Sequence, residues 1–478
     1  MKKIILITIF LLVYLYSGIL ENGILLTDDL ATGFKDNYLR RWNLGYFDFI
    51  LKYLDTPNMT SRPISSFFFY SVIYLMKFNS KFYYLNYVFF LISIFVIYIT
   101  SSKIIPKNYS IIFIVFYALI PFGTSLVFSP IMMNSNIATI FYCLSIICLF
   151  NKAKGYYYIS ILFMLFSILS YEIFIPLVFL NIFFVKGSLY KKLLYLICLV
   201  SLFLCYKKII EPNVFHNFTK REKIENLFHL KRYVILVYLS IKMILIDFPK
   251  SIYKSFIAIK YFTLVDFFVL LIYLLSSIYI IFKTNFQLLK SNSKITFFSI
   301  YALFLCFIIY SLSNYDPTLY GFSNRTLGGV RLFFSLFLVM LAYYFSTKRC
   351  SFNQVKFKII ISIFLVLFTI SSISIKNAWQ YSDNYNKKLF SKLKTQIHHK
   401  MKSRFIYINY RDEEYSKDIY ILREPIFLEH WETVALKKWT NIPVKYDIYD
   451  YKNYLNKFPD KYYIYDYPKN KLNYIETK

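Results

Sequence analysis

Two adjacent aspartates, Asp28 and Asp29, follow the first apolar segment of the chain. Carboxylates at the end of a membrane helix are costly to desolvate. Desolvation also raises a carboxyl pKa toward neutral pH, where the group can accept a proton from a hydroxyl. We therefore predict Asp28 and Asp29 as the catalytic residues, one of them as general base. A metal-binding pair and an acidic helix cap are the alternative interpretations.

Four further charged residues are candidates for binding the substrate or its phosphate: Arg62, Glu172, Arg325 and Arg331. The planar fork of arginine suits phosphate oxygens. Glu172 ends an apolar run, and an acidic side chain at such a depth usually faces a cavity or a partner. The alternatives are a hydrated interfacial glutamate and arginines that extend from the membrane toward water.

The six cysteines and five histidines show no spacing typical of a metal site or a disulfide framework. We interpret all six cysteines as structural and assign no metal to a dedicated site. No cofactor is certain. A divalent cation stays open, because the aspartate pair has the right chemistry to bind one.

Apolar segments must position these residues. The chain has 478 residues, of which 58% are hydrophobic, and its mean hydropathy is +0.47. Apolar runs of roughly 17–25 residues, enough to cross a bilayer, recur between residues 4 and 375. This pattern predicts an all-α polytopic membrane protein with about 11 transmembrane helices. The net charge of +30 does not indicate nucleic-acid binding, because Lys and Arg lie mainly in short connectors, as in cytoplasmic loops.

Lys2 and Lys3 place the start of the first helix in the cytoplasm, so residues 21–63 form an external loop. Apolar side chains recur in it at spacings of three and four between Leu39 and Tyr53, which predicts an amphipathic helix. Pro63 suits the first turn of the next helix.

Two later regions, residues 121–136 and 233–248, are apolar but do not have the pattern of a single continuous membrane helix. Residues 121–125 and 129–136 interrupt an apolar run with Pro, Gly, Ser and Asn, so we expect broken helices whose backbone needs cover from protein or water. Residues 233–248 contain Lys242 and Asp247, and we expect this segment to lie along the interface.

The C-terminal tail, residues 376–478, has 103 residues and contains no apolar run long enough to span a membrane. We divide the chain into a transmembrane domain, 1–375, and an extracytoplasmic accessory domain, 376–478. Within the latter, residues 377–403 are expected to form a helix, and 405–410, 418–422 and 462–465 short strands. The tail is thus predicted as a small C-terminal α/β domain.

The order of these motifs resembles the GT-C superfamily of membrane glycosyltransferases, close to its O-mannosyltransferase and bacterial membrane glucosyltransferase branches. The resemblance covers about residues 1–180. It lies in an acidic pair after the first helix, an Arg-Pro loop end, a Pro-rich break and a Ser-x-Glu at a helix end. In this chain these are Asp28-Asp29, Ser61-Arg62-Pro63, Pro121 with Ser129-Pro130, and Ser170-Tyr171-Glu172. The chain departs from the pattern around Pro121, which lacks a His-Pro, and at Tyr171, where Lys is commoner.

The resemblance implies an inverting glycosyltransferase that moves a monosaccharide from a polyprenyl-phosphate carrier to a cell-envelope glycan, lipid or protein acceptor. Asp28 or Asp29 would match the catalytic acidic residue of the family, and Arg325 would meet the carrier phosphate. The expected location is the bacterial cell membrane, and the expected partners are the lipid-linked sugar, its acceptor and membrane lipids, with no nucleic acid. A flippase or transporter for polysaccharides or lipid-linked sugars is the alternative from another class, and an O-antigen polymerase or ligase is a third.

Overall fold

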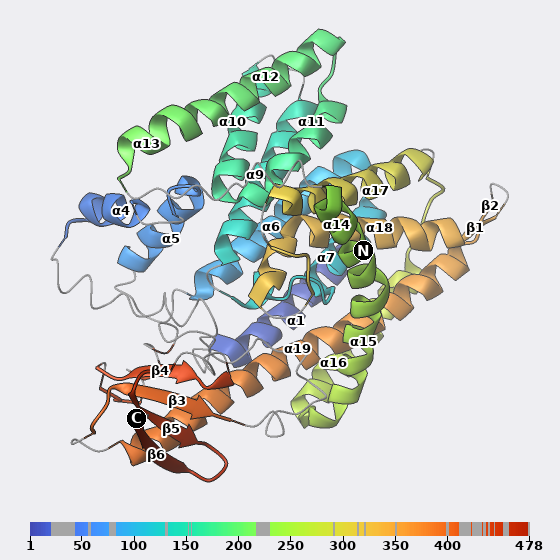
Figure 1. The fold of residues 1–478 in the computed structure, drawn as a ribbon. Helices are drawn as coiled ribbons and strands as arrows, with labels where there is room; N and C mark the ends of the chain where they lie inside the picture. The colour runs from blue at the N-terminus through green and yellow to red at the C-terminus, as the bar shows by residue number, and fades with distance from the viewer. Residues whose placement is uncertain are drawn as a thin grey trace.

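The protein is mostly helical and ends in a small sheet (Figure 1). The computed structural model describes residues 1–20, 44–55, 59–75, 83–129, 132–151, 153, 155–216, 230–289, 292–312, 315–319, 322–348, 351–397, 401–410, 422, 433, 436–437, 440–443, 445–452 and 458–476.

Seven of the described helices are long and apolar enough to cross a membrane, which is typical of a helical membrane protein. They are α6 (Tyr83–Ile104), α9 (Met133–Phe150), α12 (Leu189–Cys205) with its continuation to α13 (Glu211–Val214), α16 (Leu264–Lys283), α17 (Asn292–Ile308), α18 (Gly328–Phe345) and α19 (Gln354–Gln396). Three shorter apolar helical segments are α7 (Lys107–Leu119), α10 (Gly155–Ser170), and the 3₁₀ turn η3 (Glu172–Leu177) with α11 (Val178–Phe184). The first helix, α1, is Lys2–Leu20.

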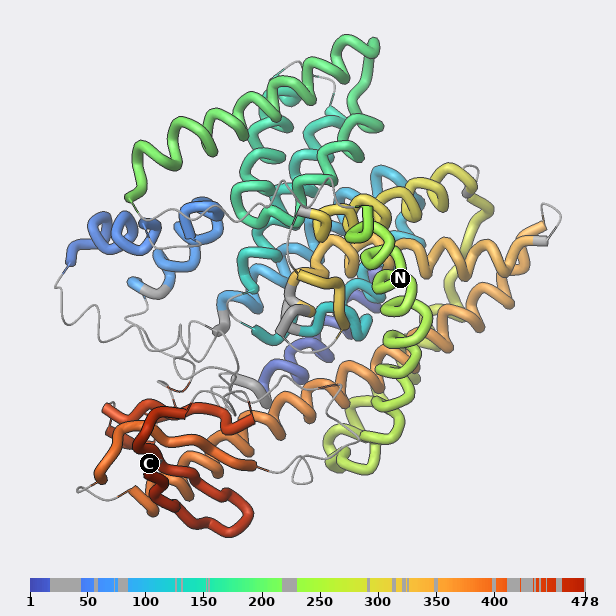
Figure 2. The backbone as a smooth tube through the Cα atoms, in the orientation of Figure 1, coloured from blue at the N-terminus to red at the C-terminus, as the bar shows by residue number. Residues whose placement is uncertain are grey.

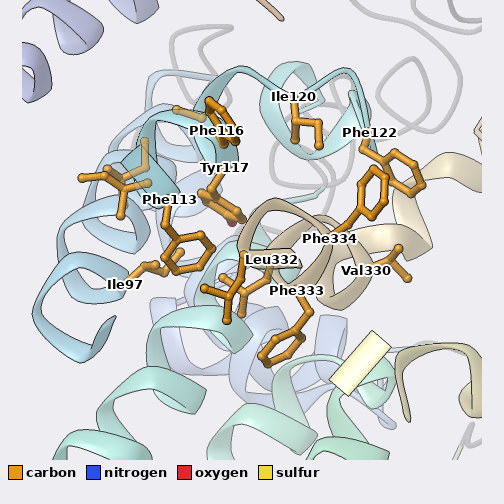
Figure 3. Packing of buried hydrophobic residues seen from close by; sticks show 14 of the residues in the cluster. Ile97, Phe113, Phe116, Tyr117, Ile120, Phe122, Val330, Leu332, Phe333 and Phe334 are labelled. Atoms are coloured by element: carbon orange, nitrogen blue, oxygen red, sulfur yellow. The ribbon is translucent and has the colours of Figure 1, made fainter. Parts of the chain in front are cut away.

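Helices α7 and α18 form the centre of the bundle. Every residue of α7 from Tyr109 to Leu119 is buried, and its aromatic side chains pack against Leu332, Phe333 and Phe334 of α18 and their neighbours (Figure 3). Peripheral helices such as α16 instead leave large apolar side chains exposed, as at Leu271 and Ile272. An apolar exposed surface on long helices is what lipid contact requires.

Helix α19 defines the two ends of the bundle, because it runs unbroken from the β1–β2 hairpin (Thr347–Lys348, Ser351–Phe352) to the C-terminal sheet (Figure 2). At the hairpin end, Lys358 Nζ donates to Phe282 O at 2.8 Å and Tyr109 Oη donates to Gln287 O at 2.7 Å. We call this the lysine end. The connectors that meet here, 103–107, 186–192, 283–294 and 347–358, contain Lys or Arg but no Asp or Glu.

The opposite end, the acidic end, holds the C-terminal sheet, α4 (Tyr46–Leu54), α5 (Pro63–Leu75) and α13 (Figure 1). Helix α4 is amphipathic and buries Phe49, Ile50 and Tyr53 against α5, where Tyr53 and Tyr70 stack with ring centroids 4.8 Å apart. The predicted amphipathic helix is thus confirmed over α4, while Leu39 lies outside the described residues. Helix α5 begins at Pro63, as predicted.

The predicted helix break is confirmed as well. Helix α7 ends at Leu119, two residues before Pro121, and the chain makes only the four-residue α8 (Ser125–Phe128) before α9 begins. Proline disfavours helical backbone in the residue before it, which explains the stop. Gly123 has φ 60°, a conformation that costs glycine little.

Residues 230–261 form a long helical segment, α14 (Leu230–Lys242), η6 (Met243–Asp247), α15 (Phe248–Ile257) and η7 (Ala258–Tyr261), which does not qualify as a membrane span. Arg232 near its start and Thr263 just after its end both bind groups at the acidic end. The segment therefore starts and finishes on the same side of the bundle, as expected for a piece that does not cross.

The C-terminal sheet has the order β4-β3-β5-β6: Asp447–Asp450, Phe405–Asn409, Lys461–Asp466 and Lys471–Glu476. Strand β3 is parallel to β4 and β5, and β6 is antiparallel to β5. The end of α19 covers one face through Leu389, Phe390 and Leu393. The strands predicted at 405–410 and 462–465 are confirmed, residues 418–421 lie outside the described part, and the expected helix is a continuation of α19.

Candidate functional site

Arg62 and Glu172 are 110 residues apart in the chain and meet at the acidic end. Arg62 Nε donates to Glu172 Oε2 at 2.5 Å, and Nη2 donates to Oε1 at 3.0 Å. Both side chains keep access to the surface, with 21% and 19% of their area exposed. The two residues that the sequence predicted separately as substrate-binding groups therefore form one bidentate ion pair.

The loop that carries Arg62 is anchored on three sides. Ser65 Oγ, in the first turn of α5, donates to Ser170 O at the end of α10 at 2.7 Å. Thr60 is fully buried, and its carbonyl accepts from the hydroxyl of Tyr206, at the end of α12. The backbone N–H of Arg62 donates to Met59 O at 3.0 Å. These contacts fix the backbone of the loop from which the Arg62 guanidinium projects.

Glu172 is positioned by a break in its own segment. Helix α10 ends at Ser170, Tyr171 is extended with φ −158° and ψ 119°, and η3 begins at Glu172 with Pro176 inside it. A proline removes a backbone donor and favours such irregular turns over a continuous helix. The break points the carboxylate of the first residue of η3 toward Arg62.

The ring of Tyr171 also contacts the Arg62 guanidinium. The Arg62 guanidinium carbon lies 4.4 Å from the centroid of the Tyr171 ring, within range for a cation–π contact. Burial lowers the pKa of Arg62, but the carboxylate of Glu172, together with Tyr171 and Tyr315, offsets this, and the net pKa lies above the ordinary value of arginine. Arg62 is therefore a permanent cation. Its Nη1 group makes no hydrogen bond to the described residues and stays available to an anion.

Arg325 lies in η9 (Phe322–Leu327), and its side chain is outside the described part. Its neighbours are fixed: Asn324 Nδ2 donates to Thr124 Oγ1 at 3.2 Å, and the hydroxyls of Thr326 and Tyr310 lie 2.7 Å apart.

The helix that follows η9 packs very closely on its surroundings. A Cβ added at Gly328 would lie 2.3 Å from Ser135 Oγ and 3.3 Å from Ile173 Cδ1. The backbone three residues after Arg325 thus touches the residue that follows Glu172. We conclude that the η9 turn belongs to the surroundings of the Arg62–Glu172 pair.

Arg331 has a different environment from the one expected of a phosphate ligand. Its side chain is 1% exposed, and its donors bind carbonyls where α7 ends. Nε donates to Tyr117 O at 2.7 Å, Nη2 to Ala118 O at 2.9 Å, and Nη1 to Phe122 O and Gly123 O at 2.7 and 3.3 Å. Arg331 supplies the protein cover that the broken helix needs, and we leave it out of the candidate phosphate site.

Sequence reasoning missed Arg232 as a partner in this region. Arg232 Nη1 donates to Asp316 Oδ1 at 2.6 Å, and Nη2 donates to Tyr315 O at 2.6 Å. Asp316-Pro317 had the pattern of a simple turn, and Arg232 lies in a polar stretch with many charges, so neither stood out. Their contact fixes the segment after α17 to the start of α14.

A second missed cluster joins α1, α16 and α19. Lys376 Nζ donates to Asp266 Oδ1 at 2.7 Å, and Tyr14 Oη donates to the same oxygen at 2.7 Å. The backbone N–H and hydroxyl of Thr263 both donate to Asp266 Oδ2 at 2.8 Å. The signal in the sequence was the Thr-x-x-Asp capping box at 263–266 before an apolar run.

Asp28 and Asp29 lie in residues 21–43, outside the described part of the chain, so their predicted catalytic role stays a prediction. Helix α1 ends at Leu20, six residues past Tyr14. Tyr14 is bound to Asp266 at the acidic end, so the segment with the two aspartates starts at the same end as Arg62 and Glu172.

The described residues contain no group of three or more His, Cys, Asp and Glu side chains that could hold a metal ion. The two aspartates are not among them, so the question of a divalent cation is unchanged. The site offers the Arg62 guanidinium as a fixed cation, with N–H donors that Glu172 does not use. The carboxylate of Glu172 orients this guanidinium. An anionic ligand such as a phosphate fits this chemistry.

Comparison with protein-family models finds no match, and comparison with curated protein sequences finds none of significance.

Proposed function

We propose that the protein is an inverting glycosyltransferase that moves a monosaccharide from a polyprenyl-phosphate carrier to an acceptor of the cell envelope. The observation that carries the proposal is the convergence of Arg62 and Glu172 at the acidic end. The loop with Asp28 and Asp29 starts at that same end. A departing phosphate needs a cation, and an attacking hydroxyl needs a base.

Each group has one role in this reaction. Arg62, oriented by Glu172 and Tyr171, binds the phosphate of the carrier, with Arg325 as a second cation. Asp28 or Asp29 accepts the proton of the acceptor hydroxyl as its oxygen bonds to the anomeric carbon. The bond from that carbon to the phosphate oxygen breaks, and polyprenyl phosphate leaves. A single displacement of this kind inverts the anomeric configuration.

We also infer the topology of the chain. If the lysine end faces the cytoplasm, as the positive-inside rule requires, the acidic end faces outward. Eleven helical segments then cross: α1, the seven long spans and the three shorter segments. Helices α4, α5 and the 230–261 segment stay on the outer side. The C-terminal domain follows α19 outward and would lie beside the acceptor, at the surface of a bacterial cell membrane.

The test is release of the carrier. Purified protein is incubated with a polyprenyl-phosphate sugar and a pool of envelope acceptors, and free polyprenyl phosphate is measured. We expect release with the wild type and none with Asp28→Asn/Asp29→Asn. No release from any donor across a panel of sugars and acceptors would overturn the proposal.

The runner-up is a flippase for lipid-linked sugars. It would move the labelled lipid across a vesicle membrane and leave the sugar–phosphate bond intact. The position of the Arg62–Glu172 pair at one end, rather than half-way along the helices, favours the enzyme.

A further inference from the structure

A groove of about 610 Å³ lies between α11 and α17, far from the Arg62–Glu172 pair and close to the lysine end. Aromatic rings form its walls. Phe184 and Phe298 meet across the two helices with ring centroids 5.5 Å apart, and Phe183 meets Tyr301 at 5.8 Å. Phe183 and Phe297 are 57% and 66% exposed, although they belong to helices that pack in the bundle.

A smaller pocket adjoins the groove. Ile104 and Phe298, which line the groove, also line this open pocket of about 50 Å³ between α6, α9 and α18, whose walls are almost wholly apolar. The groove and the adjoining pocket give a flexible hydrocarbon chain an apolar recess between the helices. A flat helix face offers no such recess.

The polar end of the groove is positively charged. Lys294, in the first turn of α17, lines it, is exposed, and makes no ion pair or hydrogen bond with the described residues. Lys103 precedes the lining residue Ile104 in the last turn of α6 and is likewise exposed. The neighbouring connectors 103–107, 186–192 and 283–294 contain no Asp or Glu. A hydrocarbon groove with an unopposed cation at its mouth suits a lipid with an anionic headgroup.

We propose that this groove binds one anionic membrane phospholipid, with an acyl chain between α11 and α17 and the phosphate beside Lys294. The proposal requires only that the helices lie in a bilayer, and it is independent of sugar transfer.

Native mass spectrometry of the purified full-length protein tests the headgroup. The protein is titrated with phosphatidylglycerol or with phosphatidylcholine of the same chains. We expect preferential retention of one phosphatidylglycerol, and a loss of about fivefold in its retention in Lys294→Gln, the effect of about one lysine at an anionic surface. Lys356→Gln is the matched control, because Lys356 is an exposed lysine at the same end that does not line the groove. Equal retention of both lipids, or equal loss in both variants, would overturn the proposal.

A photoreactive phosphatidylglycerol with a diazirine in the acyl chain tests the groove itself. We expect labelled peptides from α11 and α17, and an excess of unlabelled phosphatidylglycerol should compete the label away. Labelling spread evenly over the exposed faces of α12 and α16 would contradict a specific site.

Discussion

At the scale of single residues, the main feature is the partnership of Arg62 and Glu172. Sequence reasoning identified both, because an arginine before a proline and an acid at the end of an apolar run are unusual positions for charges. It could not predict that they bind each other. That depends on the extended residue Tyr171 and on how α5 packs against α10, which a one-dimensional pattern does not contain.

A double-mutant cycle tests the pair. We expect Arg62→Ala and Glu172→Ala to be coupled by about 0.5–3 kcal/mol in unfolding free energy, the range for residues in direct contact or in one salt-bridge network. Unfolding by detergent titration in mixed micelles measures this. Additive effects of the two substitutions would contradict the bidentate contact.

The proposed phosphate-binding role of Arg62 predicts an effect on catalysis as well as on stability. Arg62→Lys keeps the charge but loses the planar fork, so we expect carrier release to fall at least about tenfold, or about 1.4 kcal/mol of transition-state binding. Arg232→Lys is the matched control, since this arginine lies at the same end but pairs with Asp316. A fall of equal size in the control would argue for a general effect of arginine loss.

The aspartate pair carries the strongest residue-scale prediction. Asp28→Asn/Asp29→Asn should abolish transfer while membrane insertion stays normal, because the amides keep their size and lose only the ability to accept a proton. The single variants identify the base: we expect one to be inactive and the other to keep activity. Full activity in the double variant would refute the assignment.

At the scale of elements, the helix break after α7 was predicted from helix-breaking residues and is stabilised by a residue from a distant helix. Pro121 and Gly123 indicated the break, but the residue that satisfies the freed carbonyls comes from α18, over 200 positions later. Arg331 was predicted as a phosphate ligand because arginine in a membrane segment suggests function. Its four bonds to carbonyls are an equally good reason for a buried arginine, and the sequence could not distinguish the two.

We expect Arg331→Leu to lower the unfolding free energy by at least about 3 kcal/mol, because several buried carbonyls lose their donors at about 1–3 kcal/mol each. Arg331→Lys should be intermediate, since an ammonium group can reach fewer of these carbonyls. Size-exclusion profiles and detergent unfolding measure both. A leucine variant as stable as the wild type would contradict the capping role.

At the scale of the whole molecule, α19 links the bundle to the C-terminal domain. The end of the predicted transmembrane domain at residue 375 and the helix expected from 377 are parts of one 43-residue helix. Lys376 lies where they join, and its contact with Asp266 and Tyr14 fixes α19 to α16 and α1. The absence of further spanning runs after residue 375 predicted a domain boundary at this point, but not that one helix would continue through it.

Replacing either partner of the buried Lys376–Asp266 ion pair should lower the stability of the protein. We expect Asp266→Asn or Lys376→Met to lower the unfolding free energy by about 3–5 kcal/mol, because the other charge remains buried. The double variant should cost clearly less than the sum of the two. An additive double variant would show that the two charges do not interact.

The arrangement of charges at the two ends gives a direct test of orientation. In a background without the six native cysteines, Lys402→Cys places a thiol in the C-terminal domain and Lys356→Cys places one at the lysine end; both positions are exposed. A membrane-impermeant maleimide added to intact cells should label the first and not the second, because positively charged connectors stay in the cytoplasm. After permeabilisation both should react. The reverse pattern in intact cells would place the Arg62–Glu172 pair in the cytoplasm, where an extracytoplasmic acceptor could not reach it, and would overturn both the topology and the sugar-transfer proposal.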